Sequence, residues 1–378
     1  MLIRRLALQQ FRNYDRLAQE FAPGLNVLVG RNAQGKSSLL EAIYLLATTK
    51  SMRGSKDSEL IRWDAPSAVV EGRILRTRTS DVDLGISVCQ GVRKSLTVNT
   101  SATSKTMDFI GQLKVVAFGI IDVDTVRGEP ARRRRMLDLE ISQLSPSYCH
   151  SLACYRKVTE QRNRLLRTMR DRHARDLTAA SLESWTDQLI SYGGRIIERR
   201  RQFLRKLDEY AEPIHDRLTG GRERLSISYT PSFRIDASVD GVEAVSAIFK
   251  TALEGVREEE LRRQVCLLGP HRDDLVLLVN GRDVRTYGSQ GQQRSAALSL
   301  KLAEIELMQE LAEEPPVCLL DDVFSELDID RRTHLFEATL ERCQVFLTTT
   351  ELELVPEPIR KQAQAWEVAD ARLKEIRG

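Results

Sequence analysis

Residues 30–37 have the residue types and spacing that would hold phosphate groups. They read Gly-Arg-Asn-Ala-Gln-Gly-Lys-Ser and fit the pattern G-x-x-x-x-G-K-[ST], directly after an apolar run and at the start of a helical pattern. Backbone N–H groups of such a loop surround phosphates, because the glycines allow a close approach that a Cβ would block. The lysine reaches the terminal phosphates and the following hydroxyl is a Mg²⁺ ligand. This segment therefore predicts an ATP-binding site that requires Mg²⁺.

The predicted nucleotide contacts share this loop and the first turn of the helix after it, where the helix N-terminus adds partial positive charge. They are Gly30, Arg31, Asn32, Ala33, Gln34, Gly35, Lys36, Ser37 and Ser38.

An acidic pair follows a second apolar run, residues 317–320. A buried strand would deliver Asp321 and Asp322 at its carboxyl end, next to the phosphate loop. Asp321 is predicted to hold Mg²⁺ together with Ser37, and Asp322 to polarise the attacking water. Lys36, Asp321 and Asp322 are thus the predicted catalytic residues. Since many ATPases of this kind carry Glu where Asp322 stands, we expect slow hydrolysis.

A third motif, Ser289, Gln290, Gly291 and Gln292, precedes a predicted helix. A Ser and a Gly at a helix N-terminus make a second anion site. The motif resembles the signature of ABC-type ATPases, whose Ser and Gly contact the γ-phosphate bound to the opposite subunit. Residues 325–328 fit the D-loop of the same interface. The order of the motifs predicts two ATP molecules held between two copies in a two-fold dimer.

The elements that must position these motifs are assembled from both chain ends. We expect strands at 2–8, 25–29, 69–74, 82–88, 96–99, 115–118, 275–279, 284–287, 317–320 and 345–348. Helical patterns cover 35–46, 148–175, 182–218, 242–263, 291–311 and 331–341. The sequence therefore predicts an α/β ATPase head with an inserted, mainly helical lobe, divided into residues 1–125, 126–265 and 266–378.

Composition narrows the class of protein. The 378 residues include 42% hydrophobic and 29% charged residues, which argues against wholesale disorder. No run is apolar for the roughly 18 residues that a membrane helix needs, and the start of the chain has no secretory apolar region. Six cysteines without a Cys-x-x-Cys pair indicate a reducing cytosol, and no zinc site is expected.

Basic residues concentrate in the predicted helical lobe, although the net charge is only +3. Eight basic residues accompany two acidic ones from 156 to 175, and six accompany one from 195 to 206. These helices are candidates for contact with a nucleic-acid backbone, with Arg199, Arg200 and Arg201 as candidate DNA contacts; a solvated basic face is the alternative. The scarcity of aromatic residues there argues against base stacking and favours duplex or junction DNA.

Several blocks resemble the RecF family of bacterial recombination mediators. They run in order along nearly the whole chain: residues 11–14, the phosphate loop, 40–44 with 51–53, 127–130 with 132–138, 268–274, 289–294 and 319–328. The resemblance implies an ABC-type head with a helical second lobe and a weak, DNA-stimulated ATPase. It also implies ATP-dependent dimerisation on DNA in the cytoplasm. RecR is the implied direct partner, and with RecO it would help RecA onto single-stranded gaps in repair, replication restart and the damage response.

The resemblance also marks individual residues. It implies that Arg12 touches the nucleotide, as a comparable arginine does in related heads; an ordinary surface arginine is the alternative. The family usually has Thr where Ser37 stands, and Pro-Glu-Asp where this chain has residues 120–122. Residues 348–350 are threonines where ABC transporters use a His. His271, in the 268–274 block, is interpreted as structural.

Three other classes of ATP-binding protein share part of this motif pattern. The head of another SMC or Rad50-like repair ATPase would carry coiled-coil arms, and the segment between Lys36 and Asp321 lacks sustained heptads. A transporter subunit is disfavoured by the missing His and the basic lobe. A small-molecule kinase is disfavoured by the motif at 289–294 and by the absence of a lid pattern.

Overall fold

The computed structural model describes residues 1–119, 121–169, 172–325 and 327–376. Its central sheet has the strand order β15-β14-β3-β13-β12-β8. These strands are β3 (Leu25–Val29), β8 (Val115–Phe118), β12 (Val317–Asp321), β13 (Val345–Thr349), β14 (Gln364–Ala369) and β15 (Arg372–Ile376). All neighbours are parallel except the β14–β15 pair. Strands from both chain ends therefore share one sheet, as predicted, and their carboxyl ends meet at one edge.

The central strands are apolar because both faces of the sheet are covered. Val317, Cys318, Leu319 and Leu320 of β12 are completely buried, the pattern of a parallel strand between two layers. Helix α1 (Lys36–Thr48) covers one face and buries Leu39, Leu40 and Ile43 among others. The predicted strands 25–29 and 115–118 match β3 and β8 residue for residue.

A second, antiparallel sheet packs beside α1, with the order β2-β1-β4-β5-β6-β7. Its strands are β1 (Leu2–Phe11), β2 (Tyr14–Glu20), β4 (Ser67–Leu75), β5 (Val82–Cys89), β6 (Ser95–Val98) and β7 (Ser101–Thr103). Two short helices adjoin this sheet in the chain: η1 (Asp57–Leu60) precedes β4, and α2 (Thr106–Phe109) follows β7. The predicted strands 69–74, 82–88 and 96–99 correspond to β4, β5 and β6. Strands β2 and β7 are not among the predicted strands, since neither has a strong apolar alternation.

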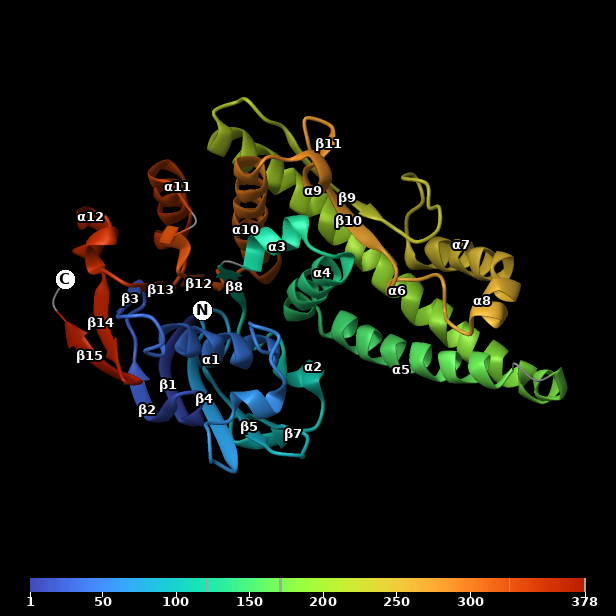
Figure 1. Ribbon diagram of the computed structural model, residues 1–378, viewed down its shortest axis with the longest axis horizontal. Coiled ribbons are helices and arrows are strands. Elements are labelled where there is room, and N and C mark those ends of the chain that lie inside the picture. The colour runs from blue at the N-terminus through green and yellow to red at the C-terminus, as the bar shows by residue number, and fades with distance from the viewer. Residues whose placement is uncertain (120, 170–171, 326, 377–378) are drawn as a thin grey trace.

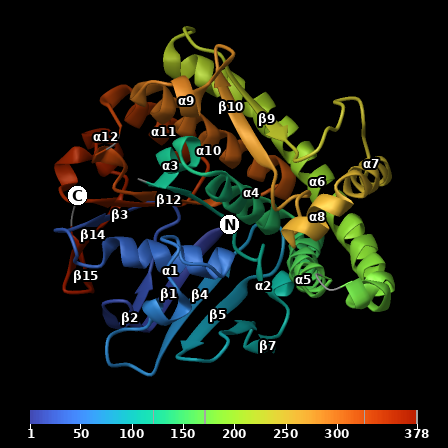
Figure 2. The same cartoon turned by 45° about the vertical axis from the view of Figure 1, so that its right-hand side comes forward.

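The helical part lies to one side of both sheets (Figure 1; Figure 2). It comprises α3 (Ile121–Arg127), α4 (Pro130–Leu144), α5 (Pro146–Thr168), α6 (Arg172–Thr219), α7 (Val242–Gly255) and α8 (Arg257–Arg263). Helix α6 runs along α5 and along α10 (Gln290–Ala312). Strands β9 (Leu225–Thr230), β10 (Asp274–Val279) and β11 (Arg282–Asp283) form a third sheet. Because β9 pairs with β10, this sheet joins residues on both sides of the predicted boundary at 265/266.

One predicted strand is wrong. Residues 284–287 form a short helix, α9 (Val284–Tyr287), because the Asp283 side chain accepts a hydrogen bond from Arg285 N at 3.0 Å and caps it. Only β11 pairs with β10 across the Asn280-Gly281 turn, whose φ angles of 51° and 75° are both positive, as the sequence indicates.

The remaining elements are η2 (Val323–Ser325), α11 (Ile329–Leu340), η3 (Leu352–Leu354) and α12 (Glu357–Arg360). Among the described residues, no helix combines the length and apolar character needed to cross a membrane.

Candidate nucleotide-binding site

The predicted phosphate loop connects β3 to α1, so its last residues form the N-terminus of that helix. Gly35 directly precedes α1 and has a φ of 113°, a backbone conformation that residues with a Cβ rarely adopt. A Cβ on Gly30 would lie 2.3 Å from the carbonyl oxygen of Val368. Both glycines are therefore required by the local packing, independently of any ligand.

The β14–β15 hairpin forms hydrogen bonds with the same loop. The side-chain oxygen of Gln34 accepts a hydrogen bond from Asp370 N at 2.7 Å, and its carbonyl accepts one from Ala371 N at 3.1 Å. Residues 351–378 are assigned to the ATPase head, but no strand or helix is predicted within them. The alternating apolar residues around Trp366 and Val368 are the signal that would have identified this hairpin.

Lys36 folds back over the loop. Its Nζ donates to the carbonyl of Gly30 and, at 2.9 Å, to that of Arg31. Burial lowers the pKa of Lys36, while the nearby carboxylates of Asp322 and Asp321 oppose the change. The ammonium thus lies between the loop and the acidic pair, where a phosphate group would supply a stronger partner than two carbonyls.

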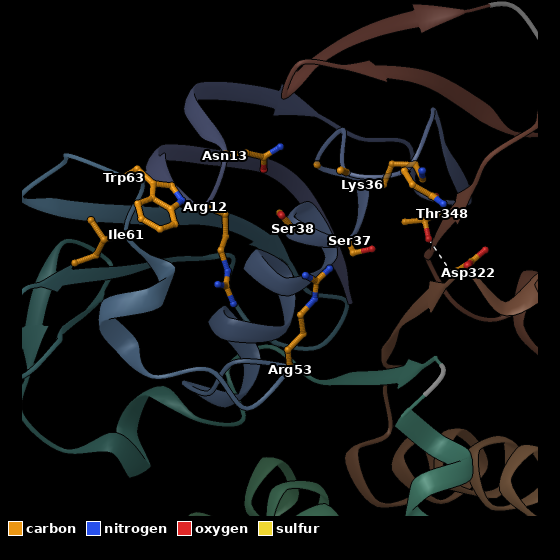
Figure 3. Close-up of a pocket in the computed structure, with 13 residues that line it drawn as sticks. Arg12, Asn13, Lys36, Ser37, Ser38, Arg53, Ile61, Trp63, Asp322 and Thr348 are labelled. Atoms are coloured by element: carbon orange, nitrogen blue, oxygen red, sulfur yellow. Dashed lines mark hydrogen bonds between the residues drawn. The ribbon is translucent and has the colours of Figure 1, made fainter.

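Ser37 and Asp321 meet at the edge of the sheet, as the sequence predicts. Ser37 Oγ donates to Asp321 Oδ1 at 2.7 Å, and Thr348 Oγ1 donates to the same oxygen at 2.8 Å. Thr348 Oγ1 in turn accepts from Asp322 N at 2.9 Å (Figure 3). Thr348, which occupies the position of the transporter His, therefore orients both acidic residues.

This donor set fits Mg²⁺. The cation prefers oxygen ligands and keeps several waters, and here a hydroxyl and a carboxylate oxygen already adjoin each other. Ser37 and Asp321 would hold the ion, which would neutralise charge on the phosphates during their transfer.

A cavity of about 360 Å³ surrounds the loop (Figure 3). It is lined by Arg12, Asn13, Asn32, Ala33, Gly35, Lys36, Ser37, Ser38, Arg53, Ile61, Trp63, Asp322 and Thr348. The sequence analysis misses Asn13, Arg53, Ile61 and Trp63 as cavity residues. Asn13 and Arg53 lie inside blocks that carry the family resemblance, and that position is the signal that would have found them.

Arg12 lines this cavity, but its guanidinium already has partners. It donates to both carboxylate oxygens of Glu41, at 2.9 and 3.0 Å, and to Ser55 Oγ at 2.8 Å. Glu41 is completely buried, so Arg12 neutralises a charge inside the fold. Contact of Arg12 with the nucleotide stays a prediction.

Trp63 is 92% exposed although it is a large apolar residue, and it lines the end of the cavity away from Lys36 (Figure 3). We expect Trp63→Ala to weaken ATP binding about tenfold, since stacking of a base on an aromatic ring contributes ~1–3 kcal/mol. Binding of a fluorescent ATP analogue checks this. Trp63→Phe keeps an aromatic face and should retain most of the affinity. Equal affinity for all three proteins would contradict the stacking role.

The predicted signature residues lie elsewhere on the surface. Ser289 is the N-cap of α10, with its Oγ accepting from Gln292 N at 3.2 Å while the Gln292 side chain accepts from Ser289 N at 2.9 Å. Ser289, Gln290 and Gly291 are exposed, and none of the residues 289–292 lines the nucleotide cavity. Within one chain the two predicted anion sites are therefore separate.

The predicted arginine trio does not form an exposed patch. Arg200 is completely enclosed, with Nη2 donating to Asp138 Oδ1 at 2.7 Å and Nη1 donating to the carbonyl of Pro270 at 2.7 Å. Arg201 is mostly buried and paired with Glu198 at 3.0 Å. The prediction that Arg200 contacts DNA is corrected, because helix α6 is covered on that side by α4 and α5 (Figure 2).

Two predicted positions fall outside the described residues. The departure at 120–122 includes residue 120, and the D-loop at 325–328 includes residue 326.

Comparison with known proteins decides the family. The family model described as "RecF/RecN/SMC N terminal domain" matches residues 2–365. The DNA replication and repair protein RecF of Halalkalibacterium halodurans is 44% identical over 99% of both chains. That of Bacillus subtilis is 41% identical over 99% of this chain and 100% of its own. This chain belongs to the RecF family.

Solved structures agree with this assignment. The recombination mediator protein RecF with ATPrS in the RecFOR pathway superimposes with a TM-score of 0.90 at 33% identity, covering 99% of this chain and 98% of that one. Its ATP form gives a TM-score of 0.89. A Pyrococcus furiosus Smc head domain, at 16% identity and a TM-score of 0.55, shares the fold alone. The predicted fold class and family resemblance are both confirmed.

Proposed function

We propose that this RecF-family chain is an ATP-dependent DNA-binding protein of recombinational repair and replication restart. It dimerises on binding ATP and Mg²⁺, binds duplex or gapped DNA, and works in the cytoplasm with RecR and RecO to help load RecA at single-stranded gaps. The family relatives are named for DNA replication and repair, and their ATP-bound structures for the RecFOR pathway. Its ATPase activity is weak and stimulated by DNA.

One observation supports the dimerisation step: the phosphate loop and the predicted signature motif lie apart within one chain. The phosphate loop opens into a cavity, while Ser289 and Gly291 are exposed on a different element. Two large apolar side chains near the predicted interface motifs in the sequence are exposed: Tyr287, just before the signature motif, is 74% exposed, and Ile329, just after the predicted D-loop, is 77% exposed. Exposed apolar residues beside a functional motif favour a surface that a partner covers.

The mechanism follows from this division. One copy holds the phosphates with its loop, Lys36 and Ser37, and the second copy covers the γ-phosphate with Ser289 and Gly291. ATP then favours the closed dimer by its differential affinity for that state. Asp322 accepts a hydrogen bond from the attacking water and orients it, and loss of the γ-phosphate releases the second copy.

Size-exclusion chromatography with and without ATP and Mg²⁺ tests the proposal. We expect the wild-type chain to shift from monomer toward dimer when ATP is present, because ATP bridges the two halves. Lys36→Met should stay monomeric, since it removes the ammonium that faces the phosphates. An unchanged elution volume for the wild type at saturating ATP would contradict ATP-dependent dimerisation.

A further inference from the structure

A second cavity, of about 300 Å³, lies between helices α4, α5 and α6 and the turn around Pro270. It shares no lining residue with the nucleotide cavity. Four arginines and one aspartate contribute its charged groups: Arg134, Arg135, Arg156, Arg200 and Asp138. The cavity therefore has an excess of positive charge, and one of its arginines, Arg135, also lines a neighbouring cavity that contains Ser37 and Asp321.

The buried part of this charge is compensated. Asp138 lies 2.7 Å from Arg200 and accepts a hydrogen bond from Tyr148 at 2.6 Å. Arg156 also reaches Asp138, at 3.2 Å, but its side chain is 62% exposed. The Arg200–Asp138 ion pair is thus a fixed part of the cavity wall. Two other arginines line the cavity without such a buried carboxylate partner among the described residues.

Arg134 and Arg135 are those arginines. Arg134 Nη1 donates to the carbonyl of Asp273 at 2.7 Å, and Arg135 Nη2 donates to the carbonyl of Ser51 at 3.1 Å. Within the part of the chain that the structure describes, neither forms an ion pair with a carboxylate. Each guanidinium keeps further N–H donors for an external anion.

The family block at 268–274 builds the back of this cavity and contributes no residue to the nucleotide site. The carbonyl of Pro270 accepts from Arg200 at 2.7 Å. His271 Nδ1 lies 2.7 Å from the Tyr155 hydroxyl, and burial lowers the pKa of His271 to about 4. The ring is therefore neutral at physiological pH. Asp274 forms a bidentate pair with Arg133, with both contacts at 2.7 Å.

Basic residues also lie in the N-terminal part of the ATPase head, close to this cavity. The pKa of Lys50, at the end of α1, is lowered by burial and also by the neighbouring charges of Lys94, Arg156 and Arg135. Arg135 of the cavity also donates to the carbonyl of Ser51, close after α1, at 3.1 Å, so the cavity adjoins the N-terminal part of the chain. A single small anion needs only the cavity, whereas a row of charges across two lobes suits a ligand with repeated phosphates.

We propose that the cavity, with Arg134, Arg135 and Arg156 among its lining residues, is a site for backbone phosphates of duplex DNA. The assignment rests on the proposed function and names the surface by which it acts. Contact with the backbone, rather than with unstacked bases, follows from the lining, because its aromatic residue Tyr155 is buried against His271.

The test is the double variant Arg134→Gln/Arg156→Gln. Asp138 keeps Arg200 and Tyr148 as partners in this protein, so no buried charge is left alone. Arg164→Gln/Arg167→Gln is the matched control, since it removes two exposed charges from the same helix region outside the cavity. Duplex affinity is measured by fluorescence anisotropy with ATP present, at several salt concentrations.

We expect the cavity variant to lose at least about tenfold in duplex affinity and its salt slope to fall by about two, since each phosphate contact contributes ~0.9. The thermal unfolding temperature and the ATP-analogue affinity of the cavity variant should equal those of the control variant. If the double variant fails to fold, the single variant Arg156→Gln, at an exposed position, should show half of this change in the salt slope. Equal duplex affinity of variant and control would overturn the site while leaving the proposed function intact.

Two further outcomes are decisive. A wild-type chain that fails to bind duplex DNA with ATP would overturn the proposed DNA binding, and the site with it. Inorganic phosphate at matched ionic strength should displace duplex only weakly. Full displacement at millimolar phosphate would assign the cavity to a free anion and overturn the nucleic-acid assignment.

Discussion

If two copies share each ATP site in a two-fold dimer, the variants Lys36→Met and Ser289→Arg should each be inactive alone. Mixed in equal amounts, they should restore about a quarter of the wild-type ATPase activity. Half of the random encounters between copies then bring one variant together with the other. In each of these, an intact phosphate loop from the Ser289→Arg copy faces an intact signature from the Lys36→Met copy. The second site of the same dimer carries both defects.

Each variant removes one half of the site and leaves the other. Lys36 faces the phosphates from its position between the loop carbonyls and the acidic pair, and its loss removes ATP binding. Ser289 is exposed and caps α10, so its replacement costs about 1 kcal/mol of helix capping and places a bulky charge on the covering surface.

Steady-state phosphate release, measured for each variant and for the mixture, checks this prediction. ATP-analogue binding is the control: the Ser289→Arg protein should bind nucleotide as a monomer, because its phosphate loop is unchanged. Full activity of Ser289→Arg alone, or a mixture no more active than its parts, would mean that ATP is cleaved within one subunit.

The second large effect concerns Asp322→Asn, which we expect to lower hydrolysis by about 100-fold or more while retaining the ATP-bound dimer. The amide has the same shape but accepts a proton poorly, so water is no longer activated. The backbone at this position has a φ of 52°, which Asn tolerates well, and the hydrogen bond from residue 322 to Thr348 involves only the backbone N–H.

Asp321→Asn is the matched contrast for this experiment. Asp321 Oδ1 accepts hydrogen bonds from Ser37 and Thr348, so its replacement disturbs the predicted Mg²⁺ site as well as hydrolysis. Light scattering with ATP should therefore show dimer for Asp322→Asn and monomer for Asp321→Asn. Rapid hydrolysis by Asp322→Asn would assign the activation of water to another residue.

Local chemistry explains why part of this site is predictable from the chain alone. The phosphate loop requires Gly30 and Gly35 for backbone reasons, and a fully apolar β12 requires a sheet covered on both faces. The contact that requires Gly30 is with distant Val368, but the positive φ of Gly35 and the apolar run of β12 depend on residues close in the chain, so both are visible as sequence patterns. The same holds for the Asn280-Gly281 turn, whereas at 284–287 the capping of a short helix by Asp283 prevails over strand-like residue types.

Long-range contacts explain the features of the site that the sequence patterns do not predict. Gln34 is held by residues more than 330 positions away. Trp63 reaches the cavity because the loop before β4 is hydrogen-bonded to the end of β1, with Arg62 N donating to the carbonyl of Gln10 at 2.8 Å. Neither neighbour follows from spacing along the chain. Arg200 shows the converse, since a run of arginines is typical of a surface, yet the packing of α6 against α4 and α5 encloses one of them and pairs it with Asp138.

The amino-acid sequence by itself determined the class of fold, the phosphate loop, the acidic pair and the separation of the motifs along the chain, because each depends on residue types at short range. Only the tertiary structure decided which arginines are free to meet an anion, since burial and pairing depend on helices brought together from distant segments. It likewise decided that Ser289 and Lys36 occupy separate surfaces of one copy.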